Sequence, residues 1–306
     1  MNNFTIISDE VKSAIVKKDP IVALESTIIS HGMPFPQNEQ TALEVEDIVR
    51  SNGVTPATVA VIKGKLKVGL NRSEIKDLST KPGVLKMSKS NLYTGILRNQ
   101  TGSTTVAATL IACKFFGLEF FATGGIGGVH RNIGELDISA DLFELANANC
   151  TVVCSGPKAI LDIPKTIEVL EAFGIPVITY KQDQIPSFWS RDSKINSSIV
   201  SHNAEEIAAM HNLRKELNVT GCQVIANPIG KKFQIKKEVI EPIIKNSIKM
   251  MKKNNITGKD ITPFLLKKIA EETDGASLKT NIQLIKSNAD LAAKIAKRAC
   301  KNLKIQ

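Results

Sequence analysis

Glu25 is a charged residue in an otherwise apolar stretch, and a buried carboxyl group is a candidate proton donor. The run Val22-Ala-Leu-Glu25-Ser-Thr-Ile-Ile predicts a strand over Ile21–Ile29 that would carry this side chain into the protein. Burial disfavours the ionised form and raises the pKa of a carboxyl group, which keeps it protonated near neutral pH. Glu25 is therefore a candidate general acid. An edge strand with Glu25 in solvent is the alternative interpretation.

Two lysines also interrupt apolar or helix-starting sequence. Lys158 follows Gly156-Pro157, and proline at a first helical position would put Lys158 in the first turn of a helix. The helix dipole disfavours a cation there and would lower the pKa of the ammonium group, giving the neutral amine that nucleophilic attack requires. A surface lysine is the alternative. Lys86 lies in the apolar run Gly83–Met87, where its charge suits a phosphate or carboxylate group of a ligand.

A glycine-rich segment, Phe121-Ala-Thr-Gly-Gly-Ile-Gly-Gly-Val-His-Arg131, follows a predicted strand. Four glycines in five positions allow the backbone amides to converge on an anion. The segment matches neither a dinucleotide-binding fingerprint nor a Walker A loop, because no Gly-Lys-Ser/Thr sequence follows. His130 and Arg131 beside the glycines favour a ligand-binding loop over a generic turn.

The segment Asp137-Ile-Ser139-Ala140-Asp141-Leu combines helix-capping residues with two carboxylates. Asp137 or Ser139 can cap a helix, and the Ser139 hydroxyl with neighbouring amides at a helix N-terminus suits a phosphate. Asp137 and Asp141 are four residues apart and also suit a hard divalent cation, which prefers oxygen ligands. An N-cap with a solvent-exposed aspartate is the alternative.

Asn281 lies in the segment Asp274-Gly-Ala-Ser-Leu-Lys-Thr-Asn281-Ile-Gln, near the beginning of a predicted helix. Its side-chain amide both donates and accepts hydrogen bonds, so it suits the imide edge of a base such as uracil. A position on the helix surface is the alternative interpretation.

The elements that must position these residues alternate along the chain. Short β-branched runs and helical patterns predict an α/β fold with three α/β/α layers, a mixed, largely parallel central sheet, and C-terminal helices packed on it. Because no linker or repeat divides the sequence, residues 1–306 are predicted to form a single domain. The expected strands are Ile21–Ile29, Thr58–Ile62, Leu66–Leu70, Gly83–Met87, Glu119–Thr123, Thr151–Ser155, Pro176–Tyr180 and Thr220–Ala226. The expected helices are Asn38–Ser51, Thr104–Phe116, Ser139–Asn147, Pro157–Phe173, Asn203–Leu217, Lys237–Lys253, Pro263–Glu272 and Ser277–Asn302.

The composition limits the classes of partner. The chain carries 40 Lys+Arg and 30 Asp+Glu, and residues 231–306 hold 18 and 7 of these, so the excess positive charge lies in the C-terminal quarter. A lysine-rich excess with only 5% aromatic residues argues against a nucleic-acid partner. Five cysteines without a zinc-ligand spacing indicate reduced thiols, and a cytoplasmic location is expected. No signal peptide is evident, and Lys114 and Glu119 interrupt the longest apolar stretch, so no membrane contact is expected.

Seven motifs together resemble those of pseudouridine-5′-phosphate glycosidases, a family also called indigoidine-synthase-A-like. In chain order they are ALESTIISHGMPFPQN, ATGGIGGVHR, DISADL, CSGPKAILD, ANPI, TPFLL and SLKTNIQL, and the resemblance extends from about Ile15 to Ala299. It implies an enzyme that reversibly cleaves the C–C glycosidic bond of pseudouridine 5′-phosphate to uracil and ribose 5-phosphate, with Mn²⁺ or another divalent cation. A non-catalytic phosphosugar- or RNA-binding protein that uses the basic C-terminal region is the alternative function.

The resemblance also implies roles for individual residues. Glu25 corresponds to the proton donor, Lys158 to a nucleophile that forms an iminium with ribose, and Asp137 to a metal-associated carboxylate. Substrate contacts are expected for Lys86, Val106, His130, Ser139, Ala140, Asp141 and Asn281, the last on the uracil side. The resemblance further implies a homotrimer with sites close to subunit boundaries.

Overall fold

One β-sheet runs through the part of the chain that the structure describes. The computed structural model describes residues 3–131 and 137–303, and these contain a sheet of eleven strands in the order β1-β4-β3-β2-β7-β8-β11-β9-β10, with β6 pairing β3 and β5. The strands are β1 (Thr5–Ile7), β2 (Ile21–Leu24), β3 (Thr55–Ile62), β4 (Lys65–Val68), β5 (Leu85–Met87), β6 (Gly102–Thr104), β7 (Phe120–Ala122), β8 (Thr151–Cys154), β9 (Val177–Tyr180), β10 (Ile199–Ser201) and β11 (Gln223–Ala226).

The sheet is mixed and largely parallel, as predicted. β2 pairs in parallel with β3 and β7, and parallel pairing continues through β8, β11, β9 and β10. β3 pairs antiparallel with β4 and β6. Because the carboxyl ends of parallel strands meet at one edge of a sheet, the segments that follow β2, β7, β8 and β11 come close together there.

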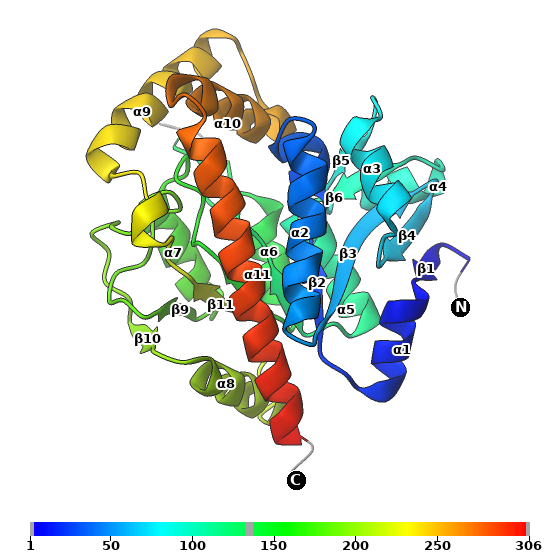
Figure 1. The fold of residues 1–306 in the computed structure, drawn as a ribbon. Helices are drawn as coiled ribbons and strands as arrows, with labels where there is room; N and C mark the ends of the chain where they lie inside the picture. Colours follow the sequence, from blue (N-terminus) through cyan, green and yellow to red (C-terminus); the bar gives the residue numbers. More distant parts are fainter. Residues whose placement is uncertain (1–2, 132–136, 304–306) are drawn as a thin grey trace.

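Helices cover both faces of the sheet, which confirms the three predicted layers (Figure 1). α1, α5, α6 and α7 pack on one face in a buried apolar cluster that includes Leu110 and Leu142. α2, α8 and α11 cover the other face in a cluster that includes Val49 and Ala292. The helices are α1 (Asp9–Lys17), α2 (Gln37–Ser51), α3 (Arg72–Thr80), α4 (Leu92–Leu97), α5 (Val106–Phe116), α6 (Ala140–Asn147), α7 (Ile163–Ala172), α8 (Ala204–Glu216), α9 (Lys237–Lys253), α10 (Ile261–Glu272) and α11 (Ala276–Leu303), with short turns η1 (Ile28–Gly32), η2 (Lys231–Phe233) and η3 (Gly258–Asp260).

The C-terminal helices pack on the rest of the protein, as predicted. α9 and α10 contact each other, and α10 contacts α11, where a third apolar cluster includes Trp189, Ile244, Leu265 and Leu284. Figure 1 shows the α9–α10 pair beside the N-terminal end of α11. None of the helices within the described ranges combines the length and the apolar character that a membrane-spanning segment needs.

The strand that precedes Glu25 is shorter than expected. The strand predicted over Ile21–Ile29 ends at Leu24, so Glu25 lies just beyond its carboxyl end rather than inside it. Thr27 then donates its hydroxyl group to the carbonyl oxygen of Thr104 at 2.7 Å. Because side-chain hydroxyl groups can replace ladder hydrogen bonds, a Ser-Thr pair can end a strand that apolar content alone would extend.

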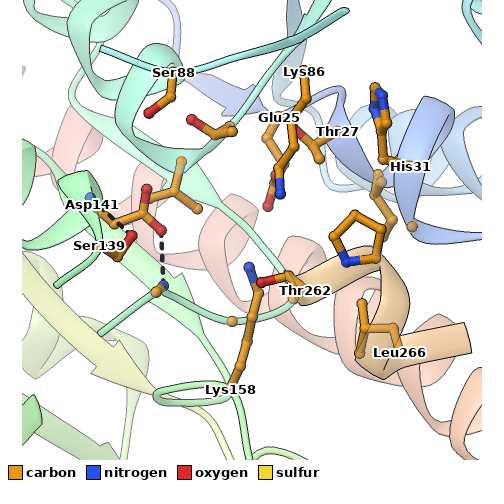
Figure 2. Close-up of a pocket in the computed structure, with 18 of the residues that line it drawn as sticks. Glu25, Thr27, His31, Lys86, Ser88, Ser139, Asp141, Lys158, Thr262 and Leu266 are labelled. Atoms are coloured by element: carbon orange, nitrogen blue, oxygen red, sulfur yellow. Dashed lines mark hydrogen bonds between the residues drawn. The ribbon is translucent and has the colours of Figure 1, made fainter. Parts of the chain in front are cut away.

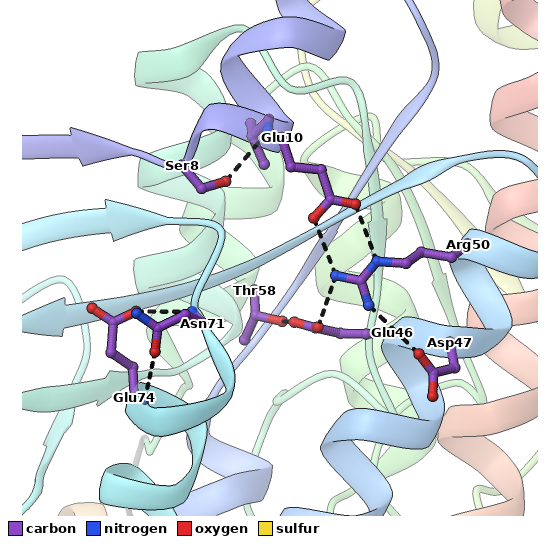
Figure 3. Close-up of polar contacts among 9 residues, drawn as sticks. Ser8, Glu10, Glu46, Asp47, Arg50, Thr58, Asn71 and Glu74 are labelled. Carbon is purple, nitrogen blue, oxygen red and sulfur yellow. Dashed lines mark hydrogen bonds and ion pairs between the residues drawn. The ribbon is translucent and has the colours of Figure 1, made fainter.

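A polar network ties α1 and α2 to β3 (Figure 3). Arg50 on α2 donates to both carboxylate oxygens of Glu10 on α1 at 3.1 Å each, and to Glu46 at 3.2 Å. Glu46 is only 4% exposed and accepts the Thr58 hydroxyl hydrogen bond at 2.6 Å. Burial raises the pKa of Glu46, although Thr58 and Arg50 both lower it. The hydrogen bonds from Thr58 and Arg50 therefore offset the free-energy cost of burying the Glu46 carboxyl group.

Replacing Thr58 with valine should destabilise the fold by about 1–3 kcal/mol, because a buried carboxyl oxygen loses its donor while the side-chain shape is kept. Urea denaturation measures the effect. Thr58→Ser keeps the hydroxyl group and should lie much closer to the unsubstituted protein. Equal stability of the valine variant and the unsubstituted protein would contradict this account of Glu46.

Candidate active site

A cavity of about 330 Å³ lies at the carboxyl ends of β2, β7 and β8 (Figure 2). Its lining comes from the segments after these strands, from β5, from the N-terminal ends of α5 and α6, and from α10 and α11. Arg131 does not line the cavity, but all ten residues to which the sequence analysis gave a catalytic, substrate-binding or metal-binding role do: Glu25, Lys86, Val106, His130, Asp137, Ser139, Ala140, Asp141, Lys158 and Asn281. The fold thus brings residues from Glu25, near the beginning of the chain, to Asn281, near its end, into one cavity.

Glu25 shares this cavity with Lys158 (Figure 2). Thr123, directly after β7, donates its hydroxyl hydrogen bond to Glu25 Oε1. Burial raises the pKa of Glu25, although the Lys158 ammonium group and the Thr123 hydroxyl group lower it. The cavity therefore favours a protonated carboxyl group close to an amine, which is the arrangement that a general acid beside a nucleophile requires.

Lys158 does not lie in a helix. The helix expected from Pro157 begins at Ile163, with Asp162 as its N-cap, so the prediction that a helix dipole acts on Lys158 is wrong. The backbone N–H of Lys158 instead donates to the carbonyl oxygen of Ile126 in the glycine-rich loop at 3.1 Å. Hydrogen bonds between the two loops thus satisfy a backbone N–H group that the first turn of a helix would leave without a partner in the helix.

Arg131 braces the turn that carries Lys158. Its guanidinium group donates to the carbonyl oxygens of Leu161 at 2.8 Å and Ala159 at 2.7 Å, and to Glu241 on α9 at 2.6 Å. A planar guanidinium group holds several acceptors at fixed angles. The arginine at the end of the glycine-rich motif therefore orients the Lys158 turn and ties it to α9.

Asp141 joins the glycine-rich loop to α5. Its Oδ1 accepts from the backbone N–H of Ala107 at 2.9 Å. Its Oδ2 accepts from the backbone N–H of Gly127 at 2.8 Å (Figure 2). Ser139, one of the two residues predicted as possible caps, is the N-cap of α6 and accepts from the backbone N–H of Asp141 at 3.2 Å. A Cβ atom on Gly127 would collide with Ser139 Oγ and Asp141 Oδ2, which explains the glycine there. Both carboxylate oxygens of Asp141 already accept hydrogen bonds from backbone amides. This disfavours a cation site in which Asp141 and Asp137 are both ligands.

Asp137 and His130 lie next to each other at the cavity, with Nδ1 and Oδ2 4.0 Å apart. Burial lowers the pKa of His130, and the Asp137 carboxylate opposes this shift. Within residues 3–131 and 137–303, no group of three or more His, Cys, Asp or Glu side chains could hold a metal ion. Asp137 is 38% exposed, so a cation bound there would take its remaining ligands from water or from a substrate.

Part of the cavity lining suits an anion. Val106 is the first residue of α5 and Ala140 the first of α6, so amides at two helix N-termini lie at the lining together with Lys86 on β5. Burial and repulsion by Lys158 lower the pKa of Lys86 to about 8, while the Asp141 carboxylate opposes this shift. A bound anion would favour the charged form of Lys86.

Asn281 lines the cavity from α11, so the interpretation of a helix-surface residue is wrong. Its Oδ1 accepts the indole N–H hydrogen bond of Trp189 at 2.6 Å. A buried aromatic residue therefore fixes the amide at this wall of the cavity.

A family described as "Indigoidine synthase A like protein" matches residues 10–298. The chain belongs to this family. A curated relative from Caldanaerobacter subterraneus subsp. tengcongensis, named pseudouridine-5′-phosphate glycosidase, is 48% identical over 297 residues, which cover 97% of each chain. A relative of the same name from Legionella pneumophila subsp. pneumophila is 50% identical over 290 residues, which cover 94% of each chain.

Two solved structures resemble this indigoidine synthase A-like protein over its whole length. The prealnumycin C-glycosynthase AlnA in complex with ribulose 5-phosphate has a TM-score of 0.91 and 30% identity, covering 100% of both chains. An indigoidine synthase A-like protein from Thermotoga maritima has a TM-score of 0.88 and 29% identity, covering 98% of both chains. The fold described above is therefore the fold of the family.

Several cavity residues of this indigoidine synthase A-like protein received no role from the sequence. Thr262, Pro263 and Leu266 reach the cavity from α10, and Thr27 and His31 reach it from the segment after Glu25. The TPFLL motif, which contains the three α10 residues, was the available signal. Its apolar spacing is typical of a core helix, so nothing local distinguishes it from packing.

Proposed function

We propose that this protein is a pseudouridine-5′-phosphate glycosidase, which reversibly converts pseudouridine 5′-phosphate and water to uracil and ribose 5-phosphate. The observation that carries the proposal is the placement of Glu25 and Lys158 in one cavity whose lining also includes groups that suit a phosphate. Curated relatives of this name, 46–50% identical over nearly the full chain, support it. A structural relative in complex with ribulose 5-phosphate supports a sugar phosphate as ligand.

The phosphate would lie against Lys86 and the beginnings of α5 and α6. Val106, Ser139 and Ala140 place backbone amides and a hydroxyl group at the cavity lining there. Lys86 adds a positive charge without a guanidinium fork, which suits a compact anion. Asp141 holds the α5 amides and the glycine-rich loop in register and so shapes this part of the lining.

The reacting bond joins C1′ of ribose to C5 of uracil, so no heteroatom leaves and two carboxylates would not suffice. Glu25 would protonate C5 of the base as the C1′–C5 bond breaks. The Lys158 amine would form a bond to C1′, and the C1′–O4′ bond would then break as O4′ takes a proton from the Lys158 nitrogen. The opened ribose would remain as an iminium until water releases the aldehyde, restores the amine and returns a proton to Glu25. In the reverse direction the Glu25 carboxylate would take the C5 proton from uracil.

A divalent cation, Mn²⁺ in the first instance, would bind at Asp137. A carboxylate with water ligands suits a hard cation, and the exposure of Asp137 leaves room for them. There the cation would supply positive charge near the substrate. His130 Nδ1 lies 4.0 Å from the Asp137 carboxylate and would therefore stand beside the bound cation.

We further propose that the protein acts in the cytoplasm as a homotrimer. The five cysteines are free thiols, which supports a reducing compartment. Phe143 on α6 and Phe173, the residue after α7, contact each other and are 45% and 39% exposed, which supports an apolar surface for a subunit contact. Light scattering of the purified protein measures the oligomeric state, and a monomer would contradict the trimer.

The function is tested by incubating the protein with pseudouridine 5′-phosphate and Mn²⁺ and measuring uracil by chromatography. Uracil and ribose 5-phosphate should appear in equal amounts, and a chelator should slow their release. Running the assay from uracil and ribose 5-phosphate should form the C–C bond again. Absence of uracil release with intact substrate would overturn the proposed function.

Substrate capture should weaken above about pH 8, because Lys86 loses its positive charge there. The ratio kcat/KM reports the protonation of the free enzyme and should fall on the alkaline side. Lys86→Arg keeps the charge at every accessible pH, so this variant should show a flatter profile even if its affinity is lower. An identical alkaline fall in both proteins would contradict the role of Lys86.

A further inference from the structure

Trp189, the single tryptophan of the chain, fixes the side chain of Asn281. Trp189 is fully buried in the segment between β9 and β10, and Phe188, which lines the cavity, packs edge-on against it at 5.2 Å. The indole Nε1 lies 2.6 Å from Asn281 Oδ1. Two segments that are far apart in the sequence thus meet at the base of the cavity wall formed by α11.

The polarity of this contact decides how Asn281 meets a ligand. An indole N–H donates and cannot accept, so the amide atom opposite it must be the carbonyl oxygen. Turning the amide over would put an NH₂ group against an N–H group and leave a buried donor without an acceptor. Among the residues that the structure describes, none accepts a hydrogen bond from Asn281 Nδ2. The group that Asn281 keeps for a ligand is therefore a donor.

We propose that Trp189 is a positioning residue that sets the base specificity of the site. By holding Asn281 Oδ1, it makes the asparagine donate from Nδ2 to a carbonyl oxygen of a pyrimidine-2,4-dione. A base with an amino group at that position would face the NH₂ group with a second donor, and both would lose their partners. The inference rests on the proposed function. It adds a reason why the Asn281 amide, which by itself can donate or accept, would distinguish a carbonyl group from an amino group on the base.

The test compares bases in the direction of C–C bond formation. Rates with ribose 5-phosphate are measured for uracil, cytosine and isocytosine, and each variant is described by its ratio of uracil to amino-base rates. Trp189→Phe removes the N–H group but keeps an aromatic ring, so the Asn281 amide becomes free to turn over. The ratio of uracil to amino-base rates should then shrink by about 10-fold, which is the effect expected of one hydrogen bond. Dividing by the ratio of the unsubstituted protein removes the intrinsic reactivity of each base.

Two further variants separate positioning from packing. Met251→Ala truncates the same apolar cluster from α9, away from the cavity lining, and should leave the ratio unchanged. Asn281→Asp lets one oxygen accept from Trp189 and turns the other toward the ligand as an acceptor, so it should shift preference toward the amino base. A Trp189→Phe ratio equal to that of the unsubstituted protein would overturn the inference.

Intrinsic fluorescence gives a readout that does not depend on turnover. Because Trp189 is the single tryptophan and touches Asn281, adding uracil should change its emission, and cytosine should do so only at about 10-fold higher concentration. If the protein forms no product at all, the proposed function fails, and this titration still decides the inference. Equal responses to uracil and cytosine would overturn it. If Trp189→Phe does not fold, the titration and Asn281→Asp decide it.

Discussion

Replacing Lys158 with alanine should abolish uracil release, lowering kcat by about 10⁴-fold or more, as expected when the group that forms the covalent intermediate is removed. The substitution takes away the amine and leaves the loop backbone in place, since the N–H of Lys158 and the carbonyl oxygens held by Arg131 do not depend on the side chain. The variant should therefore fold normally. Substrate depletion followed by chromatography measures the loss.

Borohydride reduction tests the same step directly. Ribose 5-phosphate and borohydride should attach a sugar phosphate to the unsubstituted protein, and peptide mass spectrometry should place it on Lys158. Lys165 is the matched control, because it is 61% exposed on α7 and pairs with Asp162 outside the cavity. Lys165→Ala should retain activity and trapping. An unmodified Lys158 under turnover, or an active Lys158→Ala variant, would contradict the iminium mechanism.

Part of the candidate site could be predicted from the residues alone because their types contradict their local surroundings, whereas Val106 and Ala140 followed only from the resemblance. Glu25 follows an apolar strand, Lys86 lies within one, and four glycines cluster after a third. Such conflicts between local pattern and residue type concentrate at functional sites. Parallel strands then bring these positions to one edge of the sheet, which is why residues scattered over the whole chain line a single cavity.

The helix predicted to begin at Pro157 shows a limit of prediction from local sequence. Gly-Pro after a strand is typical of a helix start, yet the loop pairs with the glycine-rich loop, and α7 begins five residues after Lys158 at Ile163. Arg131 and Glu241 stabilise that loop from positions with no sequence proximity to each other. Contacts of this kind override a local helix signal, and a single sequence does not reveal them.

Trp189 and the α10 residues could not be predicted for the same physical reason. Their apolar neighbours indicate burial, and burial alone does not tell which cavity a side chain borders. The contact between Trp189 and Asn281 joins residues 92 positions apart. The basic C-terminal quarter likewise becomes three helices, α9, α10 and α11, with buried apolar faces, of which α10 and α11 also line the cavity.

Replacing Glu25 with glutamine should lower kcat by about 10²- to 10⁴-fold in both directions, because the amide neither donates nor takes the C5 proton. KM should change much less, since the groups that suit the phosphate are untouched. Glu39 on α2 is a matched control, as it is a half-buried carboxylate outside the cavity lining, and Glu39→Gln should keep full activity. Steady-state kinetics of cleavage and synthesis measure these effects.

The pH dependence of the unsubstituted protein should have opposite signs in the two directions. Cleavage needs protonated Glu25, so its kcat should fall as pH rises through the pKa of this group, which burial raises. Synthesis needs the carboxylate, so its kcat should rise through the same pKa. Thr123 donates to Glu25 Oε1 and lowers that pKa, so Thr123→Val should move both transitions to higher pH. Glu25→Gln should lose both transitions, and their persistence in that variant would assign the proton transfer to another group.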